Sequence, residues 1–388
     1  MTLIKPLLIF VKSLLFFLFD SLALSNVRSS NSNQFKLILL IRLDAIGDFV
    51  MWLDTAKEYR QLYPPQKYKI ILICNALWYD LAKELLFWDE VLPVNIYKFK
   101  TLSIYRWNLL KQVQNLAANI ALQPTYSREF YHGDSLVRAS NASQKVSSVG
   151  DMSNRNWLKK TLADSWHTEL IPVSLKPMTE LKRNAEFLSG ILQKKYILKY
   201  PKIEVLEAWE IIKCKKKEFY VLSLGASEKC RTWPVNFYGE IAQRIYENTG
   251  WHGLVCGVSK EFNLGEQIKK ICHAPLENYA GRTSLKELAW LLAKSKILIC
   301  NESGAAHIAT AVGTSTVSIV GGGHFERFVP YPKIPGYINK LEAVYHKMPC
   351  YGCNWECIYP IKKNEPAPCI SKISVDAVWE KVKPLLPS

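Results

Sequence analysis

The chain alternates short apolar runs with amphipathic stretches, and it does so in two separate series. The segment FKLILLIR at 35–42 is almost continuously apolar, which is typical of a parallel strand buried on both faces. The segment FYVLSL at 219–224 opens the second series in the same way. Because strands that alternate with helices predict βαβ units, we expect an α/β chain of two Rossmann-like domains whose parallel sheets face a cleft.

The periodicity of each series predicts individual elements. The first series gives strands at 35–42, 69–74 and 92–94 and helices at 48–61, 76–88, 102–118 and 178–193. Residues 124–165, between the predicted helices 102–118 and 178–193, are polar and predict loops and short elements near a cleft, or a mobile insertion. The second series gives strands at 219–224, 253–257, 297–300 and 315–320 and helices at 234–248, 261–271, 284–294, 304–312 and 375–386.

A length of 388 residues exceeds the usual size of a single core, which favours more than one domain. We predict four segments. They are an apolar N-terminal segment at 1–30, a first Rossmann-like domain at 31–193, a second at 194–345, and a cysteine-containing loop with a C-terminal helix that packs back at 346–388.

The charge of the chain implies an anionic partner. It has 50 Lys and Arg against 34 Asp and Glu, for a formal net charge of +16. Such an excess suits nucleic acid, acidic lipid headgroups or a phosphorylated substrate. No helix-turn-helix, zinc-finger or RNP-like motif is visible, which argues against nucleic acid. A basic nucleic-acid-binding protein is kept as the non-enzyme alternative.

The N-terminal run LLIFVKSLLFFLF at 7–19 has three interpretations. It is shorter than the roughly 20 residues that a spanning helix needs. It could be a secretory signal, because Lys5 precedes it and small residues follow. It could also be an interfacial anchor in the headgroup region, assisted by the basic surface. We favour the anchor, since the nucleotide chemistry indicated below belongs in the cytoplasm.

Four of the ten cysteines cluster as Cys350-x2-Cys353-x3-Cys357-x11-Cys369. Four thiols at such spacing could bind zinc or an iron–sulfur centre. The last gap fits no standard zinc framework closely, so reduced thiols in a loop under the C-terminal helix are the preferred interpretation. The other cysteines are scattered through apolar segments, which suits a reducing compartment.

An acidic residue follows the first strand in the segment RLDAIGD at 42–48. Ligands of open α/β sheets bind at the carboxyl ends of strands, where loops meet helix N-termini. Asp48 is expected there, where the helix dipole favours its ionised form, so it could accept a proton from a bound hydroxyl. Asp48 could instead simply cap the helix, because Asp is among the best N-caps. Asp44 has the same two interpretations, and for it the structural one is preferred.

Two segments of the second domain have the features of an anion site. In LGASEKCRTWP at 224–234, small residues after a strand expose backbone N–H groups, and Arg231 adds a bidentate donor. In ESGAAH at 302–307, a helix N-terminus again faces the carboxyl end of a strand. His307 could equally be a hydrogen-bonded core residue. In GRTSLKE at 281–287, Ser284 or Thr283 is the expected N-cap, with Glu287 at the capping-box position.

Taken in order, RLDAIGD, LGASEKCRTWP, GRTSLKELAWLLAKSKILICNESGAAHIATAVGT and IVGGGH resemble glycosyltransferase family 9, the lipopolysaccharide heptosyltransferase family. The resemblance covers roughly residues 36–330 and is strongest over 219–321. It implies a GT-B fold, with the acceptor bound mainly to the first domain and the nucleotide sugar to the second. It also implies a cytoplasmic enzyme peripheral to the inner membrane.

The resemblance implies roles for individual residues. Asp48 matches the family's catalytic base, and Glu261 lies where a family carboxylate contacts the ribose. Glu302 and Ser303 replace the aspartate and threonine of the family's D-T-G-x-x-H segment around the phosphates, and IVGGGH departs from the usual G-P-T turn. The implied donor-binding set is Ser227, Arg231, Glu261, Thr283, Glu302, Ser303, Gly304 and His307.

The resemblance thus implies an inverting, metal-independent transferase. It would move a sugar, heptose in the first instance, from a nucleoside-diphosphate donor, ADP-linked, to a lipopolysaccharide-core or other lipid-linked glycan acceptor. No separate cofactor is expected, and no metal site of the D-x-D type is evident in the sequence. Arg231, backbone N–H groups and helix N-termini would stabilise the leaving diphosphate. A capsule or O-antigen transferase with another donor sugar is the alternative.

Overall fold

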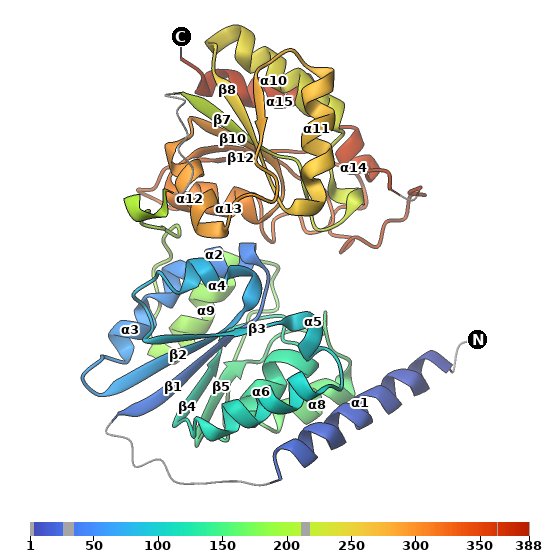
Figure 1. Ribbon diagram of the computed structural model, residues 1–388. Helices are drawn as coiled ribbons and strands as arrows, with labels where there is room; N and C mark the ends of the chain where they lie inside the picture. Colours follow the sequence, from blue (N-terminus) through green and yellow to red (C-terminus); the bar gives the residue numbers. More distant parts are fainter. Residues whose placement is uncertain (1–3, 26–34, 211–217, 363, 388) are drawn as a thin grey trace. The chain divides into compact units, whose positions relative to one another are not determined.

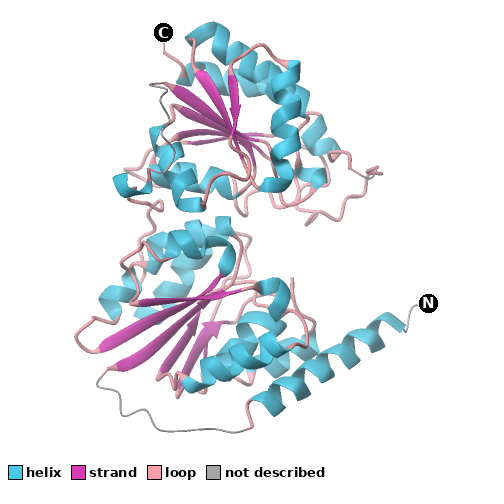
Figure 2. Ribbon diagram, in the orientation of Figure 1, coloured by secondary structure: helices cyan, strands magenta, loops and turns pink. Residues whose placement is uncertain are grey.

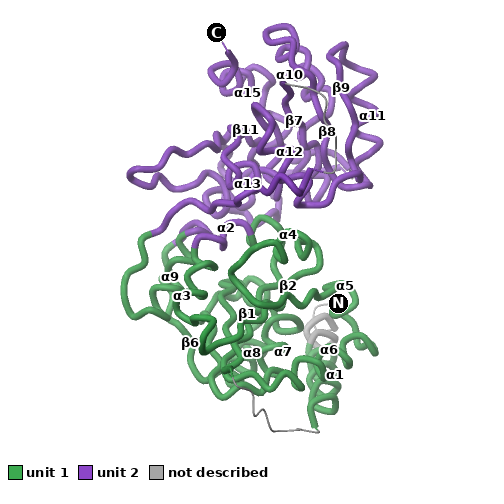
Figure 3. The backbone as a smooth tube through the Cα atoms, turned by 60° about the vertical axis from the view of Figure 1, so that its left-hand side comes forward, with its two compact units in different colours: residues 1–49, 55–176, 182–197 green, residues 50–54, 177–181, 198–388 purple. Residues whose placement is uncertain are grey.

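The computed structural model describes residues 4–25, 35–210, 218–362 and 364–387, with side chains described from residue 10 onward. The predicted segment 1–30 therefore lies partly outside the described residues. The chain divides into two compact units (Figure 3). Unit 1 comprises residues 1–49, 55–176 and 182–197, and unit 2 comprises residues 50–54, 177–181 and 198–388. Each unit is built on one parallel sheet flanked by helices (Figures 1 and 2).

Unit 1 contains a six-stranded parallel sheet in the order β3-β2-β1-β4-β5-β6. Its strands are β1 (Lys36–Arg42), β2 (Tyr68–Asn75), β3 (Glu90–Val94), β4 (Ile120–Gln123), β5 (Gln144–Ser148) and β6 (Glu169–Ile171). The α-helices of this part of the chain are α1 (Ile4–Ala23), α2 (Ile46–Ala56), α3 (Glu58–Leu62), α4 (Tyr79–Ala82), α5 (Ile96–Phe99), α6 (Ile104–Asn115), α7 (Ser135–Ala139), α8 (Trp157–Asp164) and α9 (Glu180–Leu192), with a 3-10 turn η1 (Ala76–Trp78) and a π-helical turn η2 (Phe130–Asp134). Residues 50–54 of α2 and residues 180–181 of α9 belong to unit 2.

Unit 2 contains a second six-stranded parallel sheet, in the order β12-β11-β10-β7-β8-β9. Its strands are β7 (Phe219–Ser223), β8 (His252–Cys256), β9 (Leu276–Asn278), β10 (Ile297–Asn301), β11 (Ser315–Ile319) and β12 (Leu341–Val344). Its helices are α10 (Val235–Thr249), α11 (Phe262–Ile271), α12 (Leu285–Lys294), α13 (Gly304–Val312), α14 (Pro368–Ser371) and α15 (Val375–Val382), with 3-10 turns at Glu207–Trp209, Lys229–Arg231, Ser259–Glu261 and Lys383–Leu385.

The apolar runs explain the central strands. All residues of β1 after Lys36 are buried, and β7 and β10 are buried throughout, as expected for strands covered by helices on both faces. The prediction of two Rossmann-like domains with parallel sheets is confirmed. Both sheets have the strand order of the doubly wound dinucleotide-binding fold, counted within each unit as 3-2-1-4-5-6.

Two local predictions were wrong. The helix predicted over 76–88 ends at Ala82, because Trp88 folds back and donates from Nε1 to the Ala82 carbonyl at 2.9 Å. The helix predicted over 48–61 is interrupted at Lys57. The polar segment 124–165 contains the short elements η2, α7, β5 and α8 joined by loops, as predicted.

The N-terminal apolar segment forms the helix α1, which lies along the outer edge of unit 1 beside α6 (Figure 1). Asp20 anchors it by a buried ion pair with Arg106 of α6. Among the described residues, no helix combines the length and apolarity that crossing a bilayer would require.

Candidate functional site

In both sheets, the first strand separates the two halves of the strand order. In unit 1, β1 lies between β2 and β4, and in unit 2, β7 lies between β8 and β10. Open α/β sheets bind ligands in the crevice at this switch point, outside the carboxyl ends of the strands. These two edges are therefore the candidate ligand-binding sites.

In unit 2, Asn301 ties the edge together. Asn301 is the last residue of β10 and is fully buried, and its Nδ2 donates to the Leu224 and Gly225 carbonyls after β7 at 2.8 and 3.4 Å. Its Oδ1 accepts from the Trp233 backbone N–H at 2.9 Å. Asn301 thereby fixes the loop that carries Arg231 relative to the start of α13.

At this edge, three buried polar atoms have no hydrogen-bond partner among the residues that the structure describes. They are Nε of Arg231, Oε1 of Glu302 and Oγ of Ser303. Glu302 and Ser303 are adjacent in the chain, and Arg231 is close enough to Glu302 to affect its ionisation. Buried polar groups are almost always paired in folded proteins, and leaving one unpaired costs about 1–3 kcal/mol. The cluster therefore has the character of a site whose partner is a ligand.

The electrostatics of this cluster depend on burial. Burial raises the pKa of Glu302 to about 8, although the positive charge of Arg231 partly opposes the shift. At neutral pH, Glu302 is therefore predominantly protonated, and its carboxyl group adds no negative charge beside Arg231. The cluster then presents the Arg231 guanidinium, the protonated carboxyl of Glu302, the Ser303 hydroxyl and the N-terminus of α13. This arrangement favours binding of an anion.

Two glycines bring a second carboxylate to the same edge. Gly225 follows β7 and Gly257 follows β8, and both lie under the side chain of Glu261. A Cβ at Gly225 would lie 2.0 Å from Oε1 of Glu261, and a Cβ at Gly257 would lie 2.2 Å from Oε2. Glu261 accepts from the Val258 backbone N–H at 3.1 Å, and burial raises its pKa. A side chain at either position would displace the Glu261 carboxylate from this place.

The other predicted donor residues have different environments. Ser227 is exposed in the loop after β7, and Gly304 is the first residue of α13. Thr283 is half-buried before α12, whose N-cap is Ser284, paired with Glu287 in a capping box.

His307 lies inside α13 and is almost completely buried. The ring accepts or donates a hydrogen bond at Nδ1 with the Tyr331 hydroxyl at 2.8 Å. Burial lowers the pKa of His307 to about 4, so the ring is neutral at neutral pH. Its environment matches the core-residue interpretation of the sequence, and its Tyr331 contact supports the start of α13 from within the unit.

The cysteine-containing loop packs against the same edge. The Gly322 carbonyl accepts from the Gly352 N–H at 2.8 Å, and the Gly323 carbonyl accepts from the Asn354 N–H at 3.0 Å. Trp355 from this loop stacks on Arg231, with the guanidinium carbon 4.3 Å from the ring centroid. The triple glycine after β11 permits this approach, because a Cβ at Gly323 would lie 2.4 Å from the Trp355 ring. Trp355 thus orients Arg231 by a cation–π contact.

The four clustered thiols influence one another. The pKa of Cys350 is raised by burial and by the neighbouring Cys353 and Cys357, and the pKa of Cys369 is raised by burial with contributions from the other three. Cys369 also accepts a hydrogen bond from the Gly322 N–H at 3.4 Å. Over the described part of the chain, no group of three His, Cys, Asp or Glu side chains is spaced to hold a metal ion.

In unit 1, Asp48 lies in the first turn of α2, directly after the loop that follows β1. The helix begins at Ile46, so Asp48 occupies the third helical position and is not the N-cap. Its side chain is half-buried. Carboxylates in the first turn interact favourably with the helix dipole.

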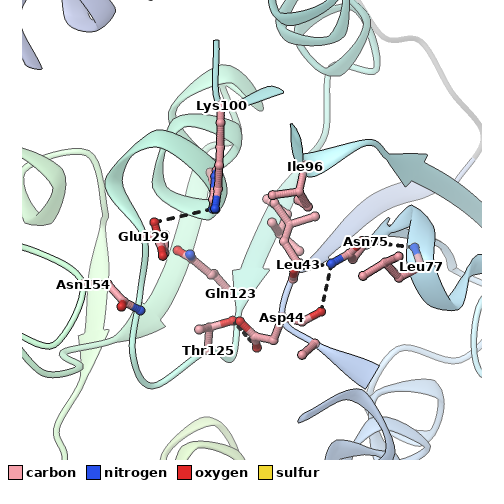
Figure 4. Close-up of a pocket in the computed structure, with 14 residues that line it drawn as sticks. Leu43, Asp44, Asn75, Leu77, Ile96, Lys100, Gln123, Thr125, Glu129 and Asn154 are labelled. Atoms are coloured by element: carbon pink, nitrogen blue, oxygen red, sulfur yellow. Dashed lines mark hydrogen bonds and ion pairs between the residues drawn. The ribbon is translucent and has the colours of Figure 1, made fainter. Parts of the chain in front are cut away.

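A cavity of about 230 Å³ opens at the carboxyl ends of β2, β1 and β4 in unit 1 (Figure 4). Asp48 does not line it, but Asp44, from the loop between β1 and α2, does. The Asp44 carboxylate pairs with Nε of Arg42 at 2.8 Å and accepts from the Thr125 hydroxyl at 3.1 Å. The cavity is lined by Ile41, Leu43, Asp44, Ala45, Asn75, Leu77, Ile96, Lys100, Gln123, Thr125, Glu129, His132, Gly133 and Asn154.

The polar wall of this cavity carries both signs of charge and a neutral imidazole. Burial raises the pKa of Glu129, while Lys100 opposes that shift and Asp44 adds to it. Burial, with the cations Lys100 and Arg106, lowers the pKa of His132 to about 3. Nε2 of His132 is buried and has no hydrogen-bond partner in the described part of the chain. A polyhydroxyl ligand could satisfy such a mixed set of donors and acceptors.

Sequence reasoning missed Trp355, Lys100, Glu129 and His132. The three glycines of IVGGGH could have signalled a close approach by another segment, but they do not identify Trp355 as that segment. Glu129 and His132 fall in the polar segment for which no residues were singled out. No local pattern marks Lys100.

Comparison with known sequences places this chain near one family. The sequence model of glycosyltransferase family 9 (heptosyltransferase) matches residues 175–352. The lipopolysaccharide core heptosyltransferase OpsX of Haemophilus influenzae is 27% identical over 124 residues, which is 31% of this chain and 35% of that protein. The match to this curated relative thus spans about a third of its length.

Solved structures superpose on a larger fraction of this chain than the sequence matches cover. The E. coli ADP-heptose lipopolysaccharide heptosyltransferase II superposes with a TM-score of 0.67 at 17% identity, covering 90% of this chain and 98% of that one. E. coli heptosyltransferase WaaC with ADP-2-deoxy-2-fluoro heptose superposes with a TM-score of 0.65 at 14% identity, covering 90% and 100%. The fold of this chain is therefore the GT-B fold of two Rossmann-like domains.

Proposed function

Because residues 175–352 match the sequence model of glycosyltransferase family 9, we propose that this chain is a member of that family and an inverting transferase of a sugar, heptose in the first instance, from an ADP-linked donor. The proposed acceptor is the lipopolysaccharide core or another lipid-linked glycan. One observation carries the proposal: Arg231, Glu302 and Ser303 present unpaired buried polar atoms at the switch point of the unit that the family model covers.

A donor diphosphate would satisfy that cluster. Its oxygens would accept from Arg231 and from the N-terminus of α13, and the protonated Glu302 could donate to it or to the sugar. The Glu261 carboxylate, which occupies the space left by Gly225 and Gly257, would accept hydrogen bonds from the ribose hydroxyls. These fixed donors would stabilise the charge that develops on the leaving diphosphate, and we propose that transfer needs no metal ion for this purpose.

In the proposed reaction, an acceptor hydroxyl oxygen attacks the anomeric carbon of the donor. A new bond forms between that oxygen and the carbon, and the bond from the carbon to the diphosphate oxygen breaks on the opposite face, which inverts the configuration. The hydroxyl proton passes to the Asp48 carboxylate, and the bonding electrons leave with the nucleoside diphosphate. The unit 1 cavity, with its charges of both signs and the neutral His132, would hold a sugar of the acceptor.

A different donor sugar, as in a capsule or O-antigen transferase, is the second candidate. Glu302 favours it, because its carboxyl group lies one methylene further from the backbone than an aspartate would place it. Specificity of a sugar site follows from such placements, since an unmatched buried polar group lowers the rate strongly. The two candidates share one reaction and differ in the donor.

The test is a panel of sugar nucleotides offered to the purified full chain. Thermal stabilisation reports binding, and release of the nucleoside diphosphate reports slow donor hydrolysis or, with acceptor added, transfer. We expect ADP-heptose to stabilise and to be turned over, with turnover unchanged by a chelator. Preference for another sugar nucleotide would select the second candidate.

Two outcomes would contradict the proposal. One is the absence of any response to sugar nucleotides together with tight, salt-sensitive binding of DNA or RNA, which would support the basic nucleic-acid-binding alternative. The other is turnover that chelation abolishes and added metal restores, which would overturn the metal-independent mechanism.

A further inference from the structure

Among the side chains of helix α1 that the structure describes, from residue 10 onward, one face packs into unit 1. The buried residues of this part of the helix are Ser13, Phe16, Asp20 and Ala23, at the spacing of a single helical face. Nε of Arg106 donates to Asp20 at 2.7 Å, and Arg106 also donates to the Tyr131 carbonyl at 2.8 Å. Because this ion pair is fully enclosed, the rotation of the helix about its axis is fixed.

The opposite face of α1 is a continuous apolar row exposed to solvent. Its side chains are between 42% and 64% exposed, and they are Phe10, Val11, Leu14, Leu15, Leu18 and Leu22. Figures 1 and 3 show the helix on the outside of unit 1, beside α6. Single exposed apolar residues are ordinary, but a contiguous row on one face marks an interaction surface. We refer to these six residues as the α1 row.

The surroundings of the α1 row are positive. Lys12 is exposed on the same helix, and its Nζ lies 5.4 Å from the centre of the Tyr131 ring. Nζ of Lys159 lies 4.6 Å from the same ring. From residue 10 to residue 25, the one acidic residue is Asp20, which is buried in its ion pair. No described carboxylate of α1 therefore faces solvent beside the row.

This combination indicates which partner fits. The cores of protein–protein interfaces are depleted in lysine and enriched in tyrosine, tryptophan and arginine, whereas the α1 row is aliphatic except for Phe10 and is flanked by lysines. An aliphatic face bordered by ammonium groups is typical of helices that lie in the interfacial region of a bilayer. Anionic headgroups attract each nearby basic residue, and the chain as a whole carries a formal charge of +16.

We propose that the α1 row docks unit 1 onto an anionic lipid bilayer, with α1 parallel to the surface, its apolar side chains among the acyl chains and Lys12 and Lys159 at the headgroups. The proposal rests on the proposed function in one respect, because docking on a bilayer would bring the chain to a lipid-linked acceptor. Binding to lipid is otherwise independent of the donor chemistry.

The test is flotation of the full chain with vesicles of phosphatidylglycerol mixed with phosphatidylcholine, compared with vesicles of phosphatidylcholine alone. We expect the wild type to float with the mixed vesicles. A triple variant, Leu14→Ser with Leu15→Ser and Leu18→Ser, should bind them at least about tenfold more weakly, because three inserted side chains are lost. The matched control replaces exposed apolar residues of unit 1 outside α1: Leu86→Ser with Leu175→Ser and Ile197→Ser.

The charge contribution is tested separately. The pair Lys12→Gln with Lys159→Gln should weaken binding to the mixed vesicles by about fivefold or more and leave the weaker binding to phosphatidylcholine unchanged. Because the α1 row has no part in donor binding, the triple Leu variant should keep the wild-type thermal shift with ADP. If no variant responds to ADP, the proposed function fails while the vesicle result still stands.

Three results would overturn the docking proposal. They are equal flotation of the triple Leu variant and the wild type, equal binding of the wild type to both vesicle types, and a wild-type dimer in solution that the triple Leu variant converts to a monomer. The last result would identify the α1 row as an interface between two copies of the chain.

Discussion

The two units share a fold and tie their strand ends in the same manner, but they leave different groups unpaired. In unit 1, Asn75 at the end of β2 donates to the Leu43 and Asp44 carbonyls at 3.1 and 3.2 Å. In unit 2, Asn301 at the end of β10 donates to the Leu224 and Gly225 carbonyls after β7. An asparagine thus joins neighbouring strand ends at both switch points.

Beyond those asparagines, the chemistry of the two edges differs. At the unit 1 edge, Asp44 is ion-paired with Arg42, and the cavity wall contains the cation Lys100, the carboxyl groups of Asp44 and Glu129, and the neutral His132. At the unit 2 edge, Arg231 lies beside a carboxyl group that burial keeps protonated. The same backbone frame can therefore present a mixed polar surface suited to a sugar or a net positive surface suited to a diphosphate, depending on a few side chains.

The largest effect is expected from Asp48→Asn in unit 1. The amide keeps the shape of the side chain but cannot accept the hydroxyl proton, so transfer should fall by about 10²–10⁴-fold. ADP affinity should not change, because the proposed donor groups lie in unit 2. Product release in single turnovers and ADP titration measure the two quantities. Loss of ADP binding together with turnover would remove the proposed division between the units.

A smaller effect is expected from Arg231→Met in unit 2. Hydrogen bonds to charged groups contribute about 1.5–3 kcal/mol each, so ADP should bind roughly 10–100-fold more weakly. Arg244→Met is the matched control, because Arg244 pairs with Glu240 and Asp376 on the surface of α10 and α15. If both variants bound ADP equally well, Arg231 would have no role in holding the diphosphate.

The two asparagines allow the strand-end ties to be compared directly. Asn301→Ala removes hydrogen bonds to two carbonyls and leaves the Trp233 N–H buried and unpaired, so the free energy of unfolding should fall by about 2–3 kcal/mol. Asn75 is slightly exposed, and Asn75→Ala should cost about 1–2 kcal/mol. Chemical denaturation measures both values, and a larger loss for Asn75→Ala would reverse the comparison.

The smallest effect is the pH dependence caused by Glu302. Its pKa is raised from 4.5 to about 8, so above pH 4.5 the folded chain retains a proton that the unfolded chain releases. The associated stability is complete below pH 4.5 and is lost as the pH rises to about 8. ADP affinity should also fall severalfold between about pH 7 and 9, because the ionised carboxylate repels the diphosphate.

Glu302→Gln is the control for this titration, since the amide keeps the size of the side chain and cannot ionise. In that variant, both the stability and the ADP affinity should vary less with pH over the same interval. A pH profile identical to that of the wild type would assign the dependence to another group.

How far the sequence predicted the molecule depended on whether the signal was local. The apolar runs of β1, β7 and β10 predicted buried parallel strands, because each is covered on both faces. The short strands β4, β5, β6, β9 and β12 were not predicted. For β5 and β6, the exposed first residues Gln144 and Glu169 belong to no apolar run. These two strands are stabilised by backbone pairing with a neighbouring strand, β5 with β4 and β6 with β5.

The site shows the same dependence. Glu302 and Ser303 directly follow β10, and Arg231 lies in the loop that follows β7, so the position of each strand predicted which edge of the sheet carries the side chain. Trp355 reaches Arg231 from a loop more than a hundred residues further along the chain, and only tertiary packing brings the two together. His132 lies in a π-helical turn, which no pattern in the sequence predicted.

Amide hydrogen exchange with and without ADP tests the division between the two units most directly. We expect ADP to protect the backbone at residues 225–231 and 302–307 in unit 2 and to leave residues 123–133 of unit 1 unchanged. Protection confined to the unit 1 cavity, or no protection at either edge, would contradict the assignment of the donor to unit 2.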